Sequence, residues 1–105
     1  MQTRNDQFST LQLALEEQFQ QHTEELTGLT VLSGEPERGG YDRETIVARI
    51  AATRQRLTDT THALRRIAEG SYGHCERCQT NIPVERLEIR PHARYCVPCQ
   101  LLVTQ

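Results

Sequence analysis

The sequence predicts a mainly α-helical protein: an antiparallel two-helix coiled-coil hairpin, then a small four-cysteine module, then a short C-terminal helix. Three observations predict this arrangement. Two long stretches repeat apolar residues at helical spacing, a stretch with glycine and proline separates them, and all four cysteines fall near the C-terminal end. We therefore expect a hairpin over residues 1–69, with a tip loop at about 33–42, and a separate module over 70–105.

The first predicted helix covers residues 5–33. Its apolar residues recur at a mean spacing of about 3.5, which is typical of the narrow seam of a coiled coil. His22 occupies the same seam, where we expect a partly exposed histidine with no ligand role. The apolar seam positions are Phe8, Leu11, Leu15, Phe19, Leu26 and Leu29.

The stretch 33–42 interrupts the helical pattern. Pro36 removes a backbone donor, Gly34 is placed to end the first helix in the left-handed conformation, and Asp42 can cap the next helix. From the residues alone, the acidic side chains here belong to a solvated loop with ordinary capping. They are Glu35, Glu37, Asp42 and Glu44.

The second predicted helix covers residues 43–69 and ends at Gly70. Folding the chain between residues 37 and 38 superimposes the two seams, with Phe8 opposite Ile67, and the shared seam is about 32 Å long. The first helix is mostly acidic and the second is rich in arginine, which favours the hairpin over self-association. We therefore expect a monomer. The second seam contains Ile46, Ile50, Thr53, Leu57, Thr60, Leu64 and Ile67.

The cysteines form two Cys-x-x-Cys pairs separated by seventeen residues. Each pair can direct two sulfurs at one ion, and this spacing is typical of a tetrahedral zinc site. We predict one Zn²⁺ held by Cys75, Cys78, Cys96 and Cys99. A closed shell of four sulfurs has no open position for water or substrate, so the zinc is expected to be structural. His74 adjoins the site but is not needed as a ligand.

Other uses of the cysteines fit less well. No apolar run follows Arg4 and Asp6 to make a secretory signal, so we expect the cytoplasm, where thiols stay reduced. A zinc deaminase needs His-x-Glu and Pro-Cys-x-x-Cys; here His22-x-Glu24 lies in the seam and Tyr95 precedes Cys96. We therefore expect no enzyme. A redox-sensing thiol and zinc switch stays open, because zinc-bound thiolates can be oxidised.

The rest of the module has two short predicted helices. Residues 84–89 form the first, and Ile82 and Leu87 are expected to cover the metal site. The last helix begins at Pro98, and its apolar residues Leu101, Leu102 and Val103 are expected to bury against the hairpin base or the metal loop. A modest basic patch is a solvated face with local ion pairs in the simplest interpretation; its residues are Arg86, Arg90 and Arg94.

Composition limits the partners. The net charge of −2 argues against binding nucleic acid through bulk positive charge. A hydrophobic content of 36% with 5% aromatic residues is thin for a thick core and suits a long exposed helical element. No uncharged run is long enough to span a bilayer, so we expect no membrane partner.

The residues from 63 to 100 resemble the DksA/TraR family of four-cysteine zinc-finger transcription factors. The matching residues are Ala63-Leu64-x-x-Ile67-x-x-Gly70-x-Tyr72-Gly73-x-Cys75-x-x-Cys78, then Ile82, Arg86-Leu87, Pro91 and Cys96-x-x-Cys99-Gln100. Ordinary zinc ribbons share the two cysteine pairs but not the helix ending in Gly-x-Tyr-Gly. The hairpin ahead of this signature matches in architecture only.

The resemblance implies a regulator that binds RNA polymerase and not specific DNA sequences. In this family the hairpin enters the secondary channel and acidic tip residues approach the active site, in some members together with ppGpp, while the zinc end docks on the rim and the C-terminal helix adds contacts. The usual tip has Asp-x-x-Asp-x-Ala, which this chain lacks. By position and charge, its tip residues are Glu35, Glu37, Asp42 and Glu44. The alternative is a zinc-finger adaptor for another protein or a nucleic acid.

Overall fold

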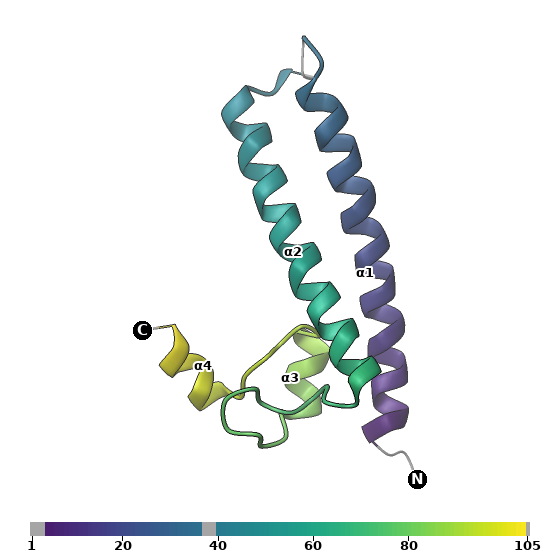
Figure 1. Cartoon of the computed structure of the whole chain (residues 1–105), viewed down its shortest axis with the longest axis vertical. Coiled ribbons are helices and arrows are strands. Elements are labelled where there is room, and N and C mark those ends of the chain that lie inside the picture. The colour runs from purple at the N-terminus through teal and green to yellow at the C-terminus, as the bar shows by residue number, and fades with distance from the viewer. Residues whose placement is uncertain (1–3, 37–39, 105) are drawn as a thin grey trace.

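Two long helices and a small module at their base make up the structure, a computed structural model that describes residues 4–36 and 40–104. Helices α1 (Arg4–Ser33) and α2 (Arg43–Glu69) lie side by side and antiparallel, and the module carries α3 (Val84–Ile89) and α4 (Val97–Val103) (Figure 1). The molecule measures 55 × 33 × 21 Å. Among the described residues there is no strand longer than a single bridge. The predicted fold class is confirmed.

The core of the molecule lies where the hairpin meets the module. Leu11 and Leu15 of α1 and Ala63 of α2 are buried there together with side chains of the module. Further along the described part of the hairpin, only Ile46, Thr53 and Thr60 are buried. The predicted seam is correspondingly incomplete, because Phe19 remains 41% exposed. Hydrophobic burial therefore stabilises the base of the hairpin more than its far end.

The ends of α2 are fixed by the two residues that the sequence indicates. The side chain of Asp42 accepts a hydrogen bond from the Thr45 N–H at 2.7 Å, as an N-cap does. At the other end Gly70 is left-handed, with φ of 81°, and its N–H donates to the carbonyls of Arg66 and Ile67. Glycine reaches this conformation without steric cost.

The prediction for Gly34 is wrong. The described glycines with positive φ are Gly40, Gly70 and Gly73, so Gly34 is not a left-handed cap. Instead α1 ends by tightening: the Gly34 N–H donates to the Val31 carbonyl and the Glu35 N–H to the Leu32 carbonyl, each at 3.0 Å. These bonds satisfy terminal carbonyls without a left-handed residue.

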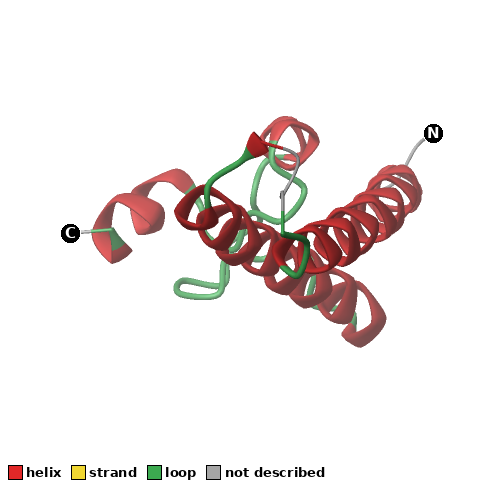
Figure 2. Ribbon diagram, turned by 90° about the horizontal axis from the view of Figure 1, so that it is seen from above, coloured by secondary structure: helices red, strands yellow, loops and turns green. Residues whose placement is uncertain are grey.

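The expected burial of the last helix is also wrong. Leu101 is 62% exposed, Leu102 52% and Val103 43%. Figures 1 and 2 show α4 projecting from the module, away from α1 and α2. Only its first turn is anchored, through buried Cys99. Because α4 begins at the second cysteine pair, the position of that pair sets the direction of the helix, and in that direction its apolar residues are exposed to solvent.

The opposite charges of α1 and α2 do not form direct pairs between described residues. The described ion pairs all converge on Glu76 in the module. Glutamates of α1 bond instead to glutamines one turn away, as in Gln12–Glu16 at 3.1 Å and Gln21–Glu17 at 3.3 Å. Such pairs support the exposed helix by a few tenths of a kcal/mol each, roughly 0.2–0.5. No described helix combines the length and apolar character needed to cross a bilayer.

The middle of the seam contains two polar atoms without partners. His22 Nδ1 and Thr53 Oγ1 are both buried and make no hydrogen bond to any described group. In the register predicted from the sequence, the two residues stand opposite each other. A buried hydroxyl without a partner destabilises the folded state by roughly 1–3 kcal/mol.

Replacing Thr53 by Val should therefore stabilise the protein. The isosteric methyl group removes the unpaired hydroxyl, and we expect the free energy of unfolding to rise by about 1 kcal/mol, or the melting temperature by about 4–8 °C. Thr61→Val is the matched control, because Thr61 is exposed on the same helix. Thermal unfolding followed by circular dichroism measures both variants. A Thr53→Val protein that melts lower would show that the hydroxyl is satisfied in solution.

Candidate metal centre

Four thiols meet at the base of the module. The sulfur atoms of Cys75, Cys78, Cys96 and Cys99 all lie within 4.8 Å of one another. The Sγ atoms of Cys78 and Cys96 are 3.7 Å apart. With Zn–S bonds of about 2.3 Å, a tetrahedral ion separates its sulfurs by about 3.8 Å. The four side chains therefore have the size and donor chemistry that one zinc ion requires.

A tight turn forms the first pair of sulfurs. The Cys75 N–H donates to the Thr80 carbonyl at 2.8 Å, and the Gln79 N–H returns to the Cys75 carbonyl at 2.9 Å. Gln79 adopts a left-handed φ of 70°, which lets the chain reverse directly after Cys78. The Cys78 N–H points at the Cys75 sulfur at 3.5 Å. The backbone thus presents both sulfurs on the same side.

The second pair comes from the start of α4. Cys96 is the N-cap residue of this helix, and Cys99 lies in its first turn. The first turn of α4 is formed by the Gln100 N–H, which donates to the Cys96 carbonyl at 2.8 Å. One turn of helix brings the two sulfurs to the same face, opposite the first pair. Sulfur exposure differs across the site, since Cys75 and Cys99 are buried and Cys78 is exposed.

The electrostatics favour a bound cation. Burial alone would raise the pKa of the Cys75 thiol, but hydrogen bonds from nearby backbone N–H groups, first that of Cys78, lower it to about 6. The neighbouring Cys96 thiol and burial raise the pKa of Cys99 to about 12. The Cys75 thiol therefore ionises easily and the Cys99 thiol does not. A divalent ion supplies the positive charge that lets all four ionise.

The four cysteines form no disulfide. All four cysteines are free, and the 3.7 Å between Cys78 and Cys96 sulfurs is far longer than a disulfide bond of about 2.05 Å. His74 is not part of the sulfur cluster. It pairs instead with Asn81 in an isolated antiparallel bridge that closes the first turn.

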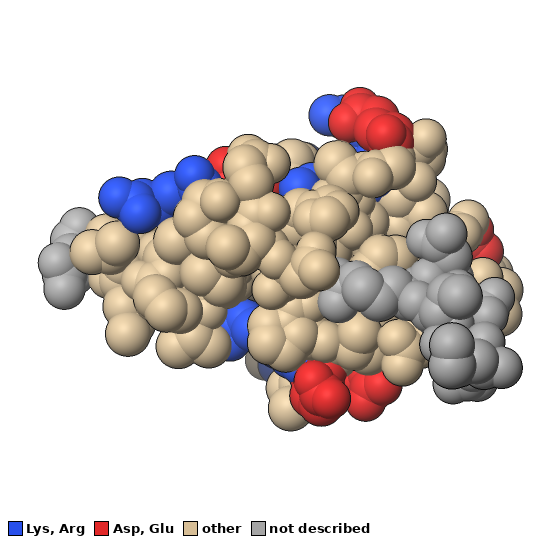
Figure 3. Space-filling view, turned by 90° about the horizontal axis from the view of Figure 1, so that it is seen from below, with Lys and Arg blue, Asp and Glu red and all other residues tan. Residues whose placement is uncertain are grey.

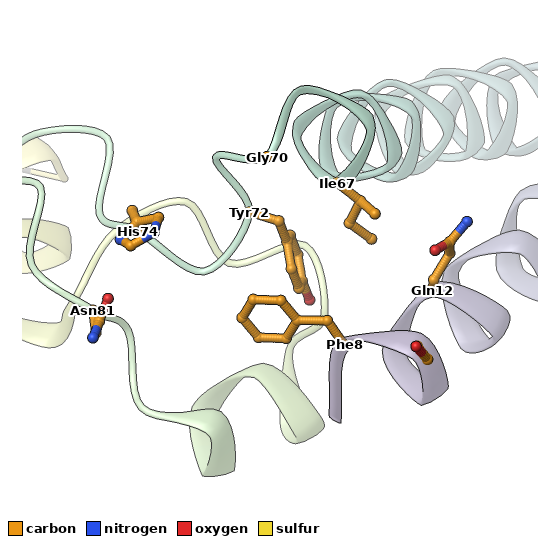
Figure 4. A pocket seen from close by; sticks show the side chains of 8 residues that line it. Phe8, Gln12, Ile67, Gly70, Tyr72, His74 and Asn81 are labelled. Atoms are coloured by element: carbon orange, nitrogen blue, oxygen red, sulfur yellow. The ribbon is translucent and has the colours of Figure 1, made fainter. Parts of the chain in front are cut away.

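An apolar layer separates the sulfurs from the hairpin. Ile82 and Leu87 are fully buried in the same cluster as Cys75, as predicted. Tyr72 packs edge to face on Phe8 of α1, with ring centres 4.9 Å apart (Figure 4), and its hydroxyl donates to the Pro91 carbonyl at 2.7 Å. Burial raises the pKa of Tyr72 to about 12, so the hydroxyl stays protonated and can donate. The metal site and the hairpin thus share one core.

Glu76 is a residue that the sequence reasoning missed. It lies between Cys75 and Cys78, and its carboxylate contacts His62 Nε2 at 3.0 Å and Arg66 Nη1 at 3.7 Å, both from α2. It also bonds to Arg94, just before the second pair of cysteines. Burial would raise the pKa of Glu76, but the bonds from Arg94 and His62 hold it below its usual value. An ionised carboxylate therefore links both cysteine pairs to α2.

Two of the three arginines of the predicted basic patch bond to other groups of the module. Arg94 pairs with Glu76, and Arg86 Nε donates to the Tyr95 carbonyl at 3.3 Å. Arg90 is exposed. Seen from below, the visible face of the module is mostly uncharged, with basic and acidic side chains mixed at its edges (Figure 3). This agrees with the interpretation as a solvated face with local ion pairs.

The predicted tip residues lie at the far end from the sulfurs. Glu35 and Glu44 are exposed, Asp42 is exposed and caps α2, and Glu37 lies outside the described residues. Their side chains are therefore not part of the metal centre. The structure places the acidic end and the thiol end at opposite ends of the hairpin (Figure 1).

Residues 70–104 match the model of the prokaryotic dksA/traR C4-type zinc finger. This module is a DksA/TraR zinc finger. The resemblance drawn from the sequence is thereby confirmed. Because the finger belongs to a four-cysteine zinc family and its sulfurs lie close together, its cysteines are positioned to bind one zinc ion.

Several curated proteins are similar to part of this chain. General stress protein 16O of Bacillus subtilis is 43% identical over 47 residues, 45% of this chain and 29% of that protein. The RNA polymerase-binding transcription factor DksA of Escherichia coli is 38% identical over 39 residues, 37% of this chain and 26% of that protein. Across the curated relatives that are compared, the matched regions span between 22% and 33% of the relative's length.

A solved structure extends the likeness to the hairpin. The transcription factor DksA2 from Pseudomonas aeruginosa superimposes with a TM-score of 0.77, covering 93% of this chain and 83% of that one. The two sequences are 24% identical over the superposition. The shared feature is therefore the fold, including the long helical pair.

Replacing Cys96 by Ser should remove the metal and unfold the finger. Structural zinc contributes roughly 10–16 kcal/mol in small finger peptides, and the thin core cannot replace it. We expect less than one zinc per chain by mass spectrometry of metals, with dispersed amide signals lost for residues 70–104. Excess chelator should have the same effect on the parent. Glu88→Gln, exposed on α3 and outside the sulfur cluster, is the control; a Cys96→Ser protein with full zinc content would contradict a four-sulfur site.

Proposed function

We propose that this chain is a zinc-containing transcription regulator that binds RNA polymerase and is not an enzyme. The hairpin enters the secondary channel and its tip modulates initiation. The observation that supports this most strongly is a DksA/TraR finger carrying a long helical pair of the DksA2 fold. Relatives that are similar over 39 residues of this chain are named RNA polymerase-binding transcription factors. We further propose action in the cytoplasm as a monomer, with ppGpp as a candidate effector of the complex.

The dimensions of the hairpin suit this role. Helix α2 has 27 residues, so it extends about 40 Å at 1.5 Å per residue. The described part of the far end consists of α1 and α2 alone (Figure 1), and its exposed side chains include the charged Glu35 and Glu44 and the apolar Val31 and Val47. Figure 1 shows α3 and α4 at the opposite end of the hairpin from the described part of the tip. A rod of this shape can reach into a narrow channel while the wider module stays outside.

The tip chemistry is acidic and partly fixed. Glu35 and Glu44 are exposed, and Asp42 is held by its bond to the Thr45 N–H. Tyr41 adds an aromatic ring over which Arg49 stacks at 4.9 Å. Carboxylates that enter a confined site interact more strongly with cations there than they do in bulk water. We propose that these charges, with Glu37, change the stability of promoter complexes.

In this proposal the zinc is structural. Cys75, Cys78, Cys96 and Cys99 are its four ligands, which leaves no position for substrate. The finger anchors the hairpin, and its outer surface, including Arg90 and the exposed apolar residues of α4, contacts the polymerase. The alternative of a general adaptor predicts a different partner for the same surfaces. A thiol switch is a further alternative, favoured by the exposed sulfur of Cys78.

Neutralising the tip should separate binding from regulation. The changes are Glu35→Gln, Glu37→Gln, Asp42→Asn and Glu44→Gln, where asparagine keeps the N-cap. We expect nearly unchanged affinity for core RNA polymerase, because exposed charges contribute roughly 0–1 kcal/mol each, but a changed yield from a sensitive promoter. Single-round transcription and a pull-down with the purified enzyme measure the two quantities.

The matched control removes the same number of charges from the middle of α1. Its changes to glutamine are at Glu16, Glu17, Glu24 and Glu25, all exposed, and this variant should regulate like the parent. Equal output from parent and tip variant would mean that the tip charges have no role. No retention of the parent on core RNA polymerase would instead favour the adaptor.

A further inference from the structure

The joint between finger and hairpin contains one carboxylate that touches three parts of the structure. Glu76 reaches His62 and Arg66 on α2, and it reaches Arg94 beside the second cysteine pair. Its own backbone N–H donates to the Arg94 carbonyl at 2.9 Å. The side chain is mostly shielded, with 22% exposure, and Arg66 is 11% exposed.

Other contacts at this joint leave room for rotation. The shared core, which includes Leu11, Leu15, Ile82 and Leu87, joins the two parts by apolar contact, but hydrophobic burial is non-directional. The Tyr72 hydroxyl fixes the loop to Pro91 within the module and not to α2. Charge-assisted hydrogen bonds are directional, and between described side chains the links from cysteine pair to α2 run through Glu76.

Arg66 makes this link stiff. Its Nη2 donates to the Ser71 carbonyl at 2.8 Å and its Nε to the Ser71 hydroxyl at 3.3 Å. The carbonyl of Arg66 accepts the N–H groups of Ser71 and Tyr72 at 2.9 and 3.1 Å. The guanidinium that faces Glu76 is therefore held on both sides, by the end of α2 and by the entry to the finger.

We propose that Glu76 is a positioning residue that sets the direction of the hairpin relative to the zinc finger. The consequence is magnified by the length of the hairpin. A rotation of 10° at the base displaces the end of an arm of about 40 Å by roughly 7 Å. If the proposed function holds, on which this consequence rests, Glu76 decides where the acidic tip lies once the finger has docked.

The test compares the orientation of the two parts in solution. Residual dipolar couplings of backbone amides are measured for the zinc-loaded parent, for Glu76→Gln and for Glu88→Gln. Glu88 is exposed on α3 and makes no ion pair with a described residue, so it controls for loss of one charge. We expect parent and control to fit one alignment tensor, and Glu76→Gln to need separate tensors for the hairpin and the finger.

A second variant removes the link from the hairpin side. His62→Ala with Arg66→Gln leaves the module sequence intact, and it should show the same loss of common alignment with one zinc per chain. It decides the question if Glu76→Gln loses zinc. A single alignment tensor for zinc-loaded Glu76→Gln, or for the double variant, overturns the proposal.

Transcription assays then separate this proposal from the proposed function. Glu76→Gln should keep the parent's retention on RNA polymerase and lose part of its effect on promoter output. The alignment measurement needs no polymerase. A parent that fails to bind RNA polymerase would therefore refute the proposed function and leave the positioning result unaffected. A single alignment tensor for Glu76→Gln would refute the positioning role and leave the proposed function unaffected.

Discussion

The structure depends on holding four sulfur atoms within reach of one ion. Four thiolates this close would repel one another, and the pKa of Cys99 is raised by its hydrogen bond to Cys96 and by burial. A divalent cation converts the repulsion into attraction. Because Cys75 and Cys99 also belong to the apolar cluster at the base of α1 and α2, the metal organises more than its own loops. The metal site is part of the apolar core that packs against the base of the hairpin.

The hairpin has an uneven distribution of stabilising contacts. Apolar burial is concentrated at the base, whereas the middle contains the unpaired His22 and Thr53 atoms and a half-exposed Phe19. The far end relies on local devices, including the Asp42 cap and the single buried Ile46. Local opening should therefore begin at the far end and spread toward the metal. This gradient is compatible with a tip that adjusts to its surroundings while the base stays fixed.

Features encoded by short-range chemistry could be predicted from the sequence. The spacing of the cysteines, the cap at Asp42 and the stop at Gly70 each depend on a few neighbouring residues, and the structure agrees with them. Gly34 was mispredicted because a tightened last turn is an equally local solution. The exposure of Leu101 and the contacts of Glu76 depend on where the metal loop directs the chain. The spacing of residues in the sequence does not predict that direction.

The unequal exposure of the four sulfurs has a kinetic consequence. Cys75 and Cys99 face the core, and Cys78 faces solvent next to the Thr80 hydroxyl, 2.9 Å away. In a zinc-loaded finger, a competing chelator or an incoming thiol from another protein would approach the ion most readily from the side of Cys78. Ligand substitution would therefore start at Cys78, and the inner sulfurs would depart last. The finger should exchange its metal by an ordered, one-sided route, at a rate that depends on the concentration of the attacking molecule.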